Sequence, residues 1–191
     1  LKPPIEIVGA EDALYPSFWN ALHREQRPLG GATLAEGIAV KNVGRLTLPV
    51  VRELVSDIVL VDEEHIERAV NAYLTLQKTM AEGAGAAGLA ALLAQPERFK
   101  GKKVGLVLCG GNIDPRLLAS IMMRELEREQ RIVSFRLTIT DRPGLLGQIA
   151  TMLGEIGANI VEVEHRRQFI DVPAKGARLD VAIETRDAAH A

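Results

Sequence analysis

The single cysteine of this chain lies where a short apolar run meets bare backbone. Cys109 follows the run VGLVL at residues 104–108 and is followed at once by Gly110 and Gly111. Because glycine has no Cβ, a ligand can approach this backbone closely, and open α/β sheets bind ligands at the carboxyl ends of their parallel strands. The pattern favours a small-molecule site in which the neutral thiol offers a hydrogen-bonding group. A buried cysteine that serves only as a small apolar residue is the alternative that the sequence leaves open.

The histidines do not complete a nucleophilic or metal site with this cysteine. They occupy no recognisable partner motif, and their spacing is not that of metal ligands. The four are His23, His65, His165 and His190. The sequence therefore gives no support for a cysteine nucleophile, although residues distant in sequence can still meet in space.

A second glycine motif has the form of a dinucleotide fingerprint. Residues 83–88 read GAGAAG, which matches G-x-G-x-x-G. The motif follows helical sequence rather than a strand, and about 20 residues later no acidic residue is present to bind a ribose. We therefore predict a helix over residues 83–93 whose small residues pack closely on a neighbour, with Glu82 facing a pocket.

The elements that must position these residues follow an α/β pattern over the first 130 residues. Short runs that are apolar on both faces predict buried parallel strands, and they alternate with helices that begin at Asp62 and at Asp114-Pro115, where aspartate is a favoured N-cap. The predicted strands are residues 5–8, 58–61 and 104–108, and the predicted helices are 63–80, 83–93 and 116–128.

The pattern changes after Gln130. Residues 133–139 and 178–184 alternate between apolar and polar side chains, which is typical of strands with one face in water. Between them, the sequence predicts a helix over 143–156, stopped by Gly157, and a strand over 158–164. The order β-α-β-β predicts a small antiparallel α+β domain over residues 131–191, separated from an α/β domain over residues 1–130.

Composition places the chain among ordinary globular proteins. Its 191 residues are 47% apolar and 25% charged, and the formal net charge is −2. An interspersed charge of this size disfavours nucleic-acid binding, and no apolar run approaches the roughly 20 residues of a membrane span. With one cysteine and no signal peptide, we expect a protein of the reducing cytoplasm with no membrane partner.

Four motifs in the first domain resemble the serine/threonine dehydratases. They occur in the family's order within about 110 residues: GATLAEGIAVK at 31–41, LPVVRELVSDIV at 48–59, EGAGAA at 82–87 and LCGGNID at 108–114. The resemblance implies the second part of a pyridoxal-phosphate enzyme of the tryptophan-synthase-β type, known as fold type II. It implies conversion of threonine, and of serine as well, into a 2-oxo acid and ammonia, with isoleucine biosynthesis as the metabolic context.

The resemblance also assigns cofactor-binding roles to individual residues. The family has serine or cysteine at the position of Cys109, where it bonds the pyridine nitrogen of the cofactor. It implies that Gly37, Glu82 and Gly110 lie beside the same ring. Glu11 resembles a carboxylate that binds a divalent cation in some relatives, but the acid expected six residues later is replaced by Ser17.

One part of the family pattern does not occur in these residues. Relatives attach the cofactor through a lysine that precedes the first motif, and no such segment is found here; Lys41 matches no lysine motif of the family. The resemblance thus implies a catalytic lysine N-terminal to this chain, which we expect to be a fragment that is inactive by itself.

The second domain resembles an ACT domain, a βαββαβ module of the ferredoxin-like type that binds amino acids. The resemblance is carried by DRPGLL at 141–146, GANI at 157–160 and VEH at 163–165, and the closing helix and strand are missing, so we expect an incomplete domain with an uncovered edge. It implies an effector site made of Asp141, Arg142, Pro143, Gly144, Leu145, Leu146 and Asn159.

Together these observations predict a pyridoxal-phosphate threonine ammonia-lyase that is regulated by an amino-acid effector and is a homo-oligomer. The alternative is a non-catalytic amino-acid-binding protein, in which the ACT part binds the ligand and the α/β part only associates. The threonine or serine preference, the effector and the size of the oligomer are not set by the sequence.

Overall fold

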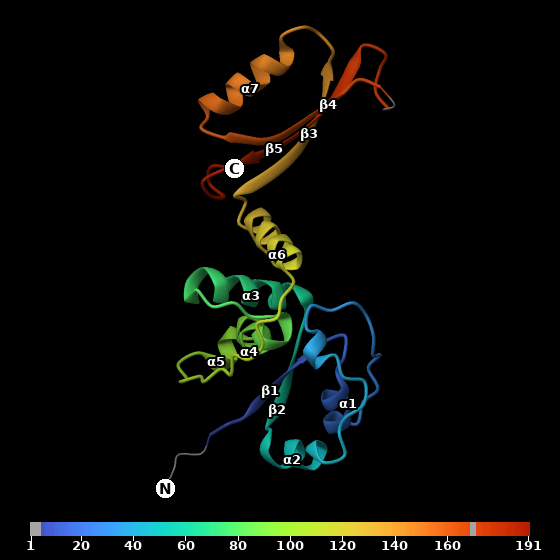
Figure 1. The fold of residues 1–191 in the computed structure, drawn as a ribbon, viewed down its shortest axis with the longest axis vertical. Helices are drawn as coiled ribbons and strands as arrows, with labels where there is room; N and C mark the ends of the chain where they lie inside the picture. The colour runs from blue at the N-terminus through green and yellow to red at the C-terminus, as the bar shows by residue number, and fades with distance from the viewer. Residues whose placement is uncertain (1–4, 169–170) are drawn as a thin grey trace. The chain divides into compact units, whose positions relative to one another are not determined.

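The computed structural model describes residues 5–168 and 171–191, and these form two compact units (Figure 1). The first unit ends at Ile121 and the second begins at Met122, so the division falls within helix α6 (Pro115–Arg128). We describe each unit by itself.

The first unit is built on two parallel strands. β1 (Val8–Asp12) pairs with β2 (Asp57–Val61) in the register Val8 to Asp57 through Asp12 to Val61. The helices around them are α1 (Ser17–His23), the 3-10 helix η1 (Glu36–Ile38), α2 (Thr47–Leu54), α3 (Glu63–Gln77), α4 (Gly83–Ala94), α5 (Pro96–Phe99) and the start of α6. α4 packs on both strands and α3 packs on α4, whereas α1 lies beside the strands away from α3 and α4 (Figure 1).

Local chemistry explains where the helices begin. Asp62 caps α3 by accepting a 2.9 Å hydrogen bond from the amide of His65, and acidic residues occupy the first turn. α4 starts at Gly83 and buries its glycines and alanines, which lets it approach its neighbours closely. The core between these helices and the strands includes Val59, Val61, Ile66, Val70 and Ala90.

Two of the three predicted strands of this unit need correction. The strand predicted at residues 5–8 runs from Val8 to Asp12 instead, and residues 104–108 form no strand. Val107 in that run is 81% exposed, and no described strand pairs with it. An apolar run becomes a strand only when a neighbouring strand supplies its hydrogen bonds. The helix predicted over 63–80 ends three residues earlier, where Lys78 adopts a left-handed conformation with φ of 56°.

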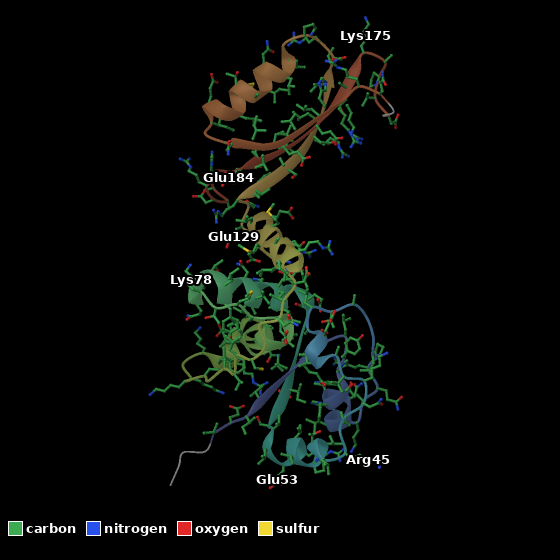
Figure 2. All side chains as sticks on the ribbon, in the orientation of Figure 1. Arg45, Glu53, Lys78, Glu129, Lys175 and Glu184 are labelled. Carbon is green, nitrogen blue, oxygen red and sulfur yellow. The ribbon has the colours of Figure 1, made fainter. Side chains whose placement is uncertain are left out.

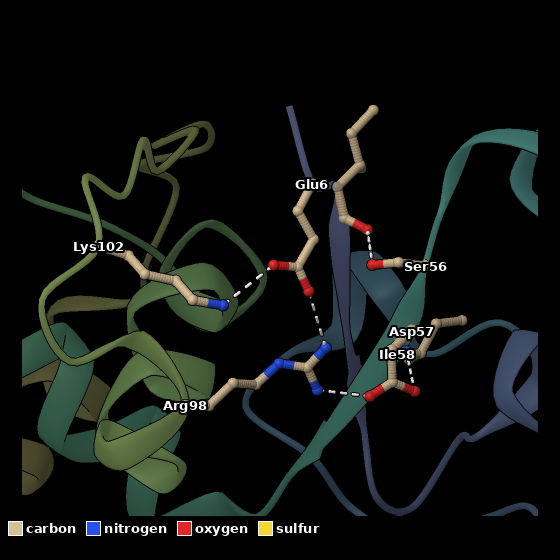
Figure 3. Close-up of polar contacts among 7 residues, drawn as sticks. Glu6, Ser56, Asp57, Ile58, Arg98 and Lys102 are labelled. Atoms are coloured by element: carbon tan, nitrogen blue, oxygen red, sulfur yellow. Dashed lines mark hydrogen bonds and ion pairs between the residues drawn. The ribbon is translucent and has the colours of Figure 1, made fainter. Parts of the chain in front are cut away.

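A set of charged side chains connects the two strands with the loop around α5 (Figure 3). Arg98 donates to Asp57 at 2.5 Å and lies 3.5 Å from Glu6, which also accepts from Lys102 at 3.1 Å. The guanidinium lowers the pKa of Asp57 by hydrogen bonding to it. These contacts hold α5 against the N-terminal ends of both strands.

The second unit is a three-stranded antiparallel sheet with one helix on it. The strands are β3 (Ile132–Thr140), β4 (Asn159–Arg166) and β5 (Gly176–Glu184), and they lie in the order β3-β5-β4 across the sheet. The helix α7 (Leu145–Glu155) connects β3 with β4 (Figure 1). The predicted order β-α-β-β is confirmed. Residues of β5 that face α7 are buried, as in Leu179, Val181 and Ile183, and they pack with Ile149 and Leu153 of that helix.

Both charged and apolar side chains are exposed on the two units, and Leu46 and Leu76 are examples of the apolar ones. Exposed charged examples are Arg45, Glu53, Lys78, Glu129, Lys175 and Glu184 (Figure 2). None of the helices in the described part of the chain has both the length and the apolar character needed to cross a membrane.

Candidate functional site

Three segments of the first unit that are distant in sequence enclose a cavity of about 420 Å³. They are the stretch from Thr33 to Gly37, the start of α4 at Glu82 to Ala84, and the stretch from Asn112 to Leu117 that leads into α6. A volume of this size is within the range of roughly 300–1,000 Å³ that is usual for small-molecule sites. The cavity is therefore large enough for a compact ligand.

Glu82 is the centre of this arrangement. Its amide donates a 3.1 Å hydrogen bond to the carbonyl oxygen of Gly110, and a Cβ on Gly110 would lie only 2.3 Å from Oε1 of Glu82. A Cβ on Gly37 would lie 3.6 Å from the same oxygen. The structure thus brings together three of the predicted site residues, and glycine is required at position 110 because its φ is +79° and its Cα faces a carboxylate.

The backbone of the cysteine loop packs tightly against α4. A Cβ on Gly85 would lie 1.8 Å from the carbonyl oxygen of Cys109, so a side chain at position 85 has no room. The thiol itself is exposed and is not among the groups that line the cavity. The alternative of Cys109 as a buried apolar residue is therefore wrong in the described structure.

The two helix N-termini at the cavity differ in whether a side chain accepts hydrogen bonds from their first amides. At α6, Oδ1 of Asp114 accepts from the amides of Arg116 at 2.9 Å and Leu117 at 3.0 Å, so those donors are already used. At α4, no side chain caps the first turn. A helix N-terminus carries partial positive charge, and Glu82 lies directly before the first residue of α4.

The sequence did not predict the residues that fix the position of residues 33–35, which lie in one wall of this cavity. Asp12 is fully buried and accepts from the amide of Leu14 at 2.6 Å and from the hydroxyl of Thr33. The Thr33 oxygen accepts in turn from the amide of Ala35 at 3.0 Å, and Oε2 of Glu63 accepts from the amide of Leu34 at 2.9 Å. An acid at the end of a buried strand was the available signal, since the carboxyl ends of strands are where such sites are built.

Glu11 has a different role from the one that the resemblance suggested. Its two carboxylate oxygens accept from the amides of Phe18 at 2.8 Å and Trp19 at 2.9 Å, at the start of α1. Burial raises its pKa above 4.5. Among residues 5–168 and 171–191, no group of three or more His, Cys, Asp or Glu side chains is placed to hold a metal ion. The structure therefore shows Glu11 as a helix-capping residue.

The predicted effector residues of the second unit do not all lie together. Asp141 to Leu146 form one turn between β3 and α7, in which Gly144 has φ of +86°. The amide of Asp141 donates to the carbonyl oxygen of Lys175 at 2.8 Å, and the guanidinium of Arg142 lies 3.5 Å from Oε1 of Gln148. Asn159 is opposite Glu184 in the ladder, whereas the strand end before the turn, Thr140, is opposite Gly176. At about 3.3 Å per residue, Asn159 is roughly 25 Å along the sheet from that turn.

Comparisons with known proteins show the family of this chain. Residues 1–110 match the family described as pyridoxal-phosphate dependent enzymes. The chain is similar to L-threonine ammonia-lyases from Thermotoga maritima, at 38% identity over 100% of this chain and 48% of that protein, and from Geobacter sulfurreducens, at 38% over 98% and 47%. It spans about half the length of these curated relatives. It also resembles the processed form of threonine deaminase isoform 2 from Solanum lycopersicum, with a TM-score of 0.56, 29% identity, and coverage of 64% of this chain and 35% of that structure.

Proposed function

The chain belongs to the family of pyridoxal-phosphate dependent enzymes, and we propose that the protein it represents is a threonine ammonia-lyase. Such an enzyme removes water and then ammonia from threonine to give 2-oxobutanoate, and we extend the proposal to serine. The observation that carries it is the meeting of Gly37, Glu82 and Gly110, of which Gly37 and Glu82 line one cavity. Support also comes from the curated threonine ammonia-lyases that match the chain along its length.

The residues at the cavity fit a flat aromatic cofactor. Gly37 and Gly110 let their backbone approach the Glu82 carboxylate closely, because a Cβ on Gly110 would lie 2.3 Å from Oε1 of Glu82. The cavity lining carries three carboxylates, those of Glu36, Glu82 and Asp114, and no positively charged side chain, and the exposed thiol of Cys109 lies outside this lining. In this proposal Gly37, Glu82, Cys109 and Gly110 hold the ring.

Each of these residues then has a definite task. When bound, pyridoxal phosphate supplies an electron sink for the charge that develops at the substrate Cα. The Cys109 side chain would meet the ring nitrogen with a hydrogen-bonding thiol in place of a carboxylate, which would limit the withdrawal of electrons by the ring. Glu82, when ionised, can only accept hydrogen bonds, so it orients a donor on the ring or the substrate. We assign covalent attachment and removal of the α-proton to a lysine outside these 191 residues, and we expect the chain alone to be inactive.

Turnover tests the proposal directly. The protein expressed from its complete reading frame should convert threonine to 2-oxobutanoate, and Cys109→Asp should lower kcat by at least tenfold while the cofactor remains bound, because a carboxylate stabilises the protonated form of the ring nitrogen. Cys109→Ser, which keeps a neutral hydroxyl, is the matched control and should retain most of the turnover. Absence of 2-oxobutanoate, or equal kcat in Cys109→Asp and the parent, would contradict the proposal.

We further propose that residues 131–191 act as an ACT-type regulatory domain. The βαββ order, with the third strand between the first two, supports a ferredoxin-like arrangement, and the turn at Asp141 to Leu146 leads into a helix whose first amides can bind a carboxylate. Titration calorimetry with isoleucine, valine, threonine and serine should give saturable heat for at least one of them. No heat from any of the four would remove this part of the proposal.

A further inference from the structure

A second cavity of the first unit lies on the side of the strands away from the α4 core. Its volume is about 250 Å³, and its walls come from β1, β2, α1, η1 and α2. The floor is Gly9, where a Cβ would lie 3.1 Å from Cγ1 of Ile58 and 3.7 Å from Cγ1 of Val55. The remaining side chains that matter here are Phe18, Ile38 and Val51.

The lining leaves no polar group for a ligand inside the cavity. Apart from Glu11, the side chains that line it are apolar. Both oxygens of Glu11 already accept amide hydrogen bonds from α1. The buried side-chain polar atoms without a partner in the described residues, such as Oε1 of Glu63, lie elsewhere. A polar ligand would therefore lose its hydrogen bonds to water without replacement, whereas a hydrocarbon group would not.

The size of the cavity sets the size of such a group. An apolar cavity of about 150 Å³ accepts benzene, which has six carbons. A cavity of about 250 Å³ is larger and therefore has room for a linear hydrocarbon chain of about six to eight carbons. The charge of the lining also disfavours an anionic ligand, because the carboxylate of Glu11 in the cavity wall would repel a negatively charged group inside the cavity.

The second cavity shares a wall with the first. Gly37 lines both cavities, with Glu36 on the side of the first and Ile38 on the side of the second. These three residues are the 3-10 helix η1, which has no side-chain cap and is held by backbone bonds to Ala35 and Glu36. A group that packs on Ile38 therefore also restrains the backbone of Gly37.

We propose that this cavity is a binding site for the hydrocarbon portion of a small aliphatic molecule and that its occupancy is coupled through η1 to the Gly37 wall of the first cavity. Binding does not depend on the proposed lyase function. Only the effect of the coupling on a cofactor rests on it.

A series of linear alcohols from propanol to octanol tests the proposal on the protein expressed from its complete reading frame. In NMR spectra of protein with labelled isoleucine and valine methyl groups, the methyl signals of Ile38, Val51 and Ile58 should shift and reach saturation as the alcohol is added. The Kd should fall about fourfold for each added CH₂, as transfer of apolar area predicts, and should stop falling at six to eight carbons. The amide signal of Gly37 should shift with the same Kd.

Two substitutions on the same helix separate the cavity from the surface. Val51→Phe fills the cavity and should raise the Kd of hexanol at least tenfold. Leu54→Phe changes a side chain that is 55% exposed and does not line the cavity, so it should leave the Kd unchanged. If Val51→Phe fails to fold, Val51→Leu should instead shorten the best alcohol by about one carbon.

Three results would overturn the proposal. The first is a shift that does not saturate. The second is an equal Kd in the parent and in the folded Val51 variant. The third is a doubled mass in solution with protected Val51 and Ile58 methyl groups, which would mean that a second copy of the chain fills the cavity. None of these results bears on threonine turnover, so failure here and failure of the proposed function are distinguishable.

Discussion

The two units arrange their motif residues in opposite ways. In the first unit, residues from three distant segments meet around Glu82, and the contacts are made by backbone that has no room for a side chain. In the second unit, the motif residues from Asp141 to Leu146 form one exposed turn, and Asn159 lies at the other end of the sheet. The difference teaches that the first site is specified by close packing across the chain, whereas the second is specified only locally.

Glycine substitutions should show the largest contrast between the units. Gly85→Ala should lower the free energy of unfolding of the first unit by about 3 kcal/mol, because its Cβ would lie 1.8 Å from the Cys109 carbonyl oxygen and the backbone must move. In α7, a Cβ on Gly147 meets nothing within 4 Å, and Gly147→Ala should raise the stability of the second unit by up to about 1 kcal/mol. Urea unfolding followed by Trp19 fluorescence reports the first unit, and circular dichroism reports both.

Gly88 provides the control within α4. A Cβ there would lie 3.7 Å from Cδ2 of Leu106, which is ordinary contact, so Gly88→Ala should leave stability unchanged or raise it. Equal losses for Gly85→Ala and Gly88→Ala would show that α4 does not press on the cysteine loop.

Removal of an aspartate should give the next largest contrast. Asp12→Ala leaves the part-buried Leu14 amide and Thr33 hydroxyl without their acceptor, so the first unit should lose about 1–3 kcal/mol. Asp180→Ala in the second unit removes a 2.5 Å bond to Arg136 on a solvent-facing surface, and the loss should be much smaller because water screens that pair. Thermal unfolding of both variants measures the difference, and similar shifts in Tm would contradict the assigned burial.

The pH dependence of stability should show the smallest contrast between the two units. Burial raises the pKa of Glu11 above 4.5, so its contribution to stability is present below pH 4.5 and is lost as the pH rises through its folded value. The hydrogen bond from Arg136 lowers the pKa of Asp180 below 3.8, so its contribution is present above pH 3.8 and is lost as the pH falls. Carboxyl ¹³C titration should place the two pKa values on opposite sides of their ordinary values. The same direction for both would contradict the account.

Local signals in the sequence predicted helices α3, α4, α6 and α7, whereas α1, α2, η1 and α5 were not predicted. Asp62 and Asp114-Pro115 marked helix starts that the structure has, and the GAGAAG run predicted α4. The run at 104–108 was mispredicted because strand formation depends on a partner strand. The bonds of Asp12 to Thr33 and of Glu63 to Leu34 join residues 21 and 29 positions apart, and no local pattern encodes such contacts. The distance of Asn159 from the Asp141 turn likewise follows from strand register.

The protonation state of the ring nitrogen tests the central claim most directly. We predict that ¹⁵N-labelled pyridoxal phosphate, bound to the protein expressed from its complete reading frame, gives the ¹⁵N shift of an unprotonated pyridine beside Cys109 and the shift of a protonated one in Cys109→Asp. The same ¹⁵N shift in both proteins would mean that position 109 does not face the ring nitrogen, and the assigned site would be wrong.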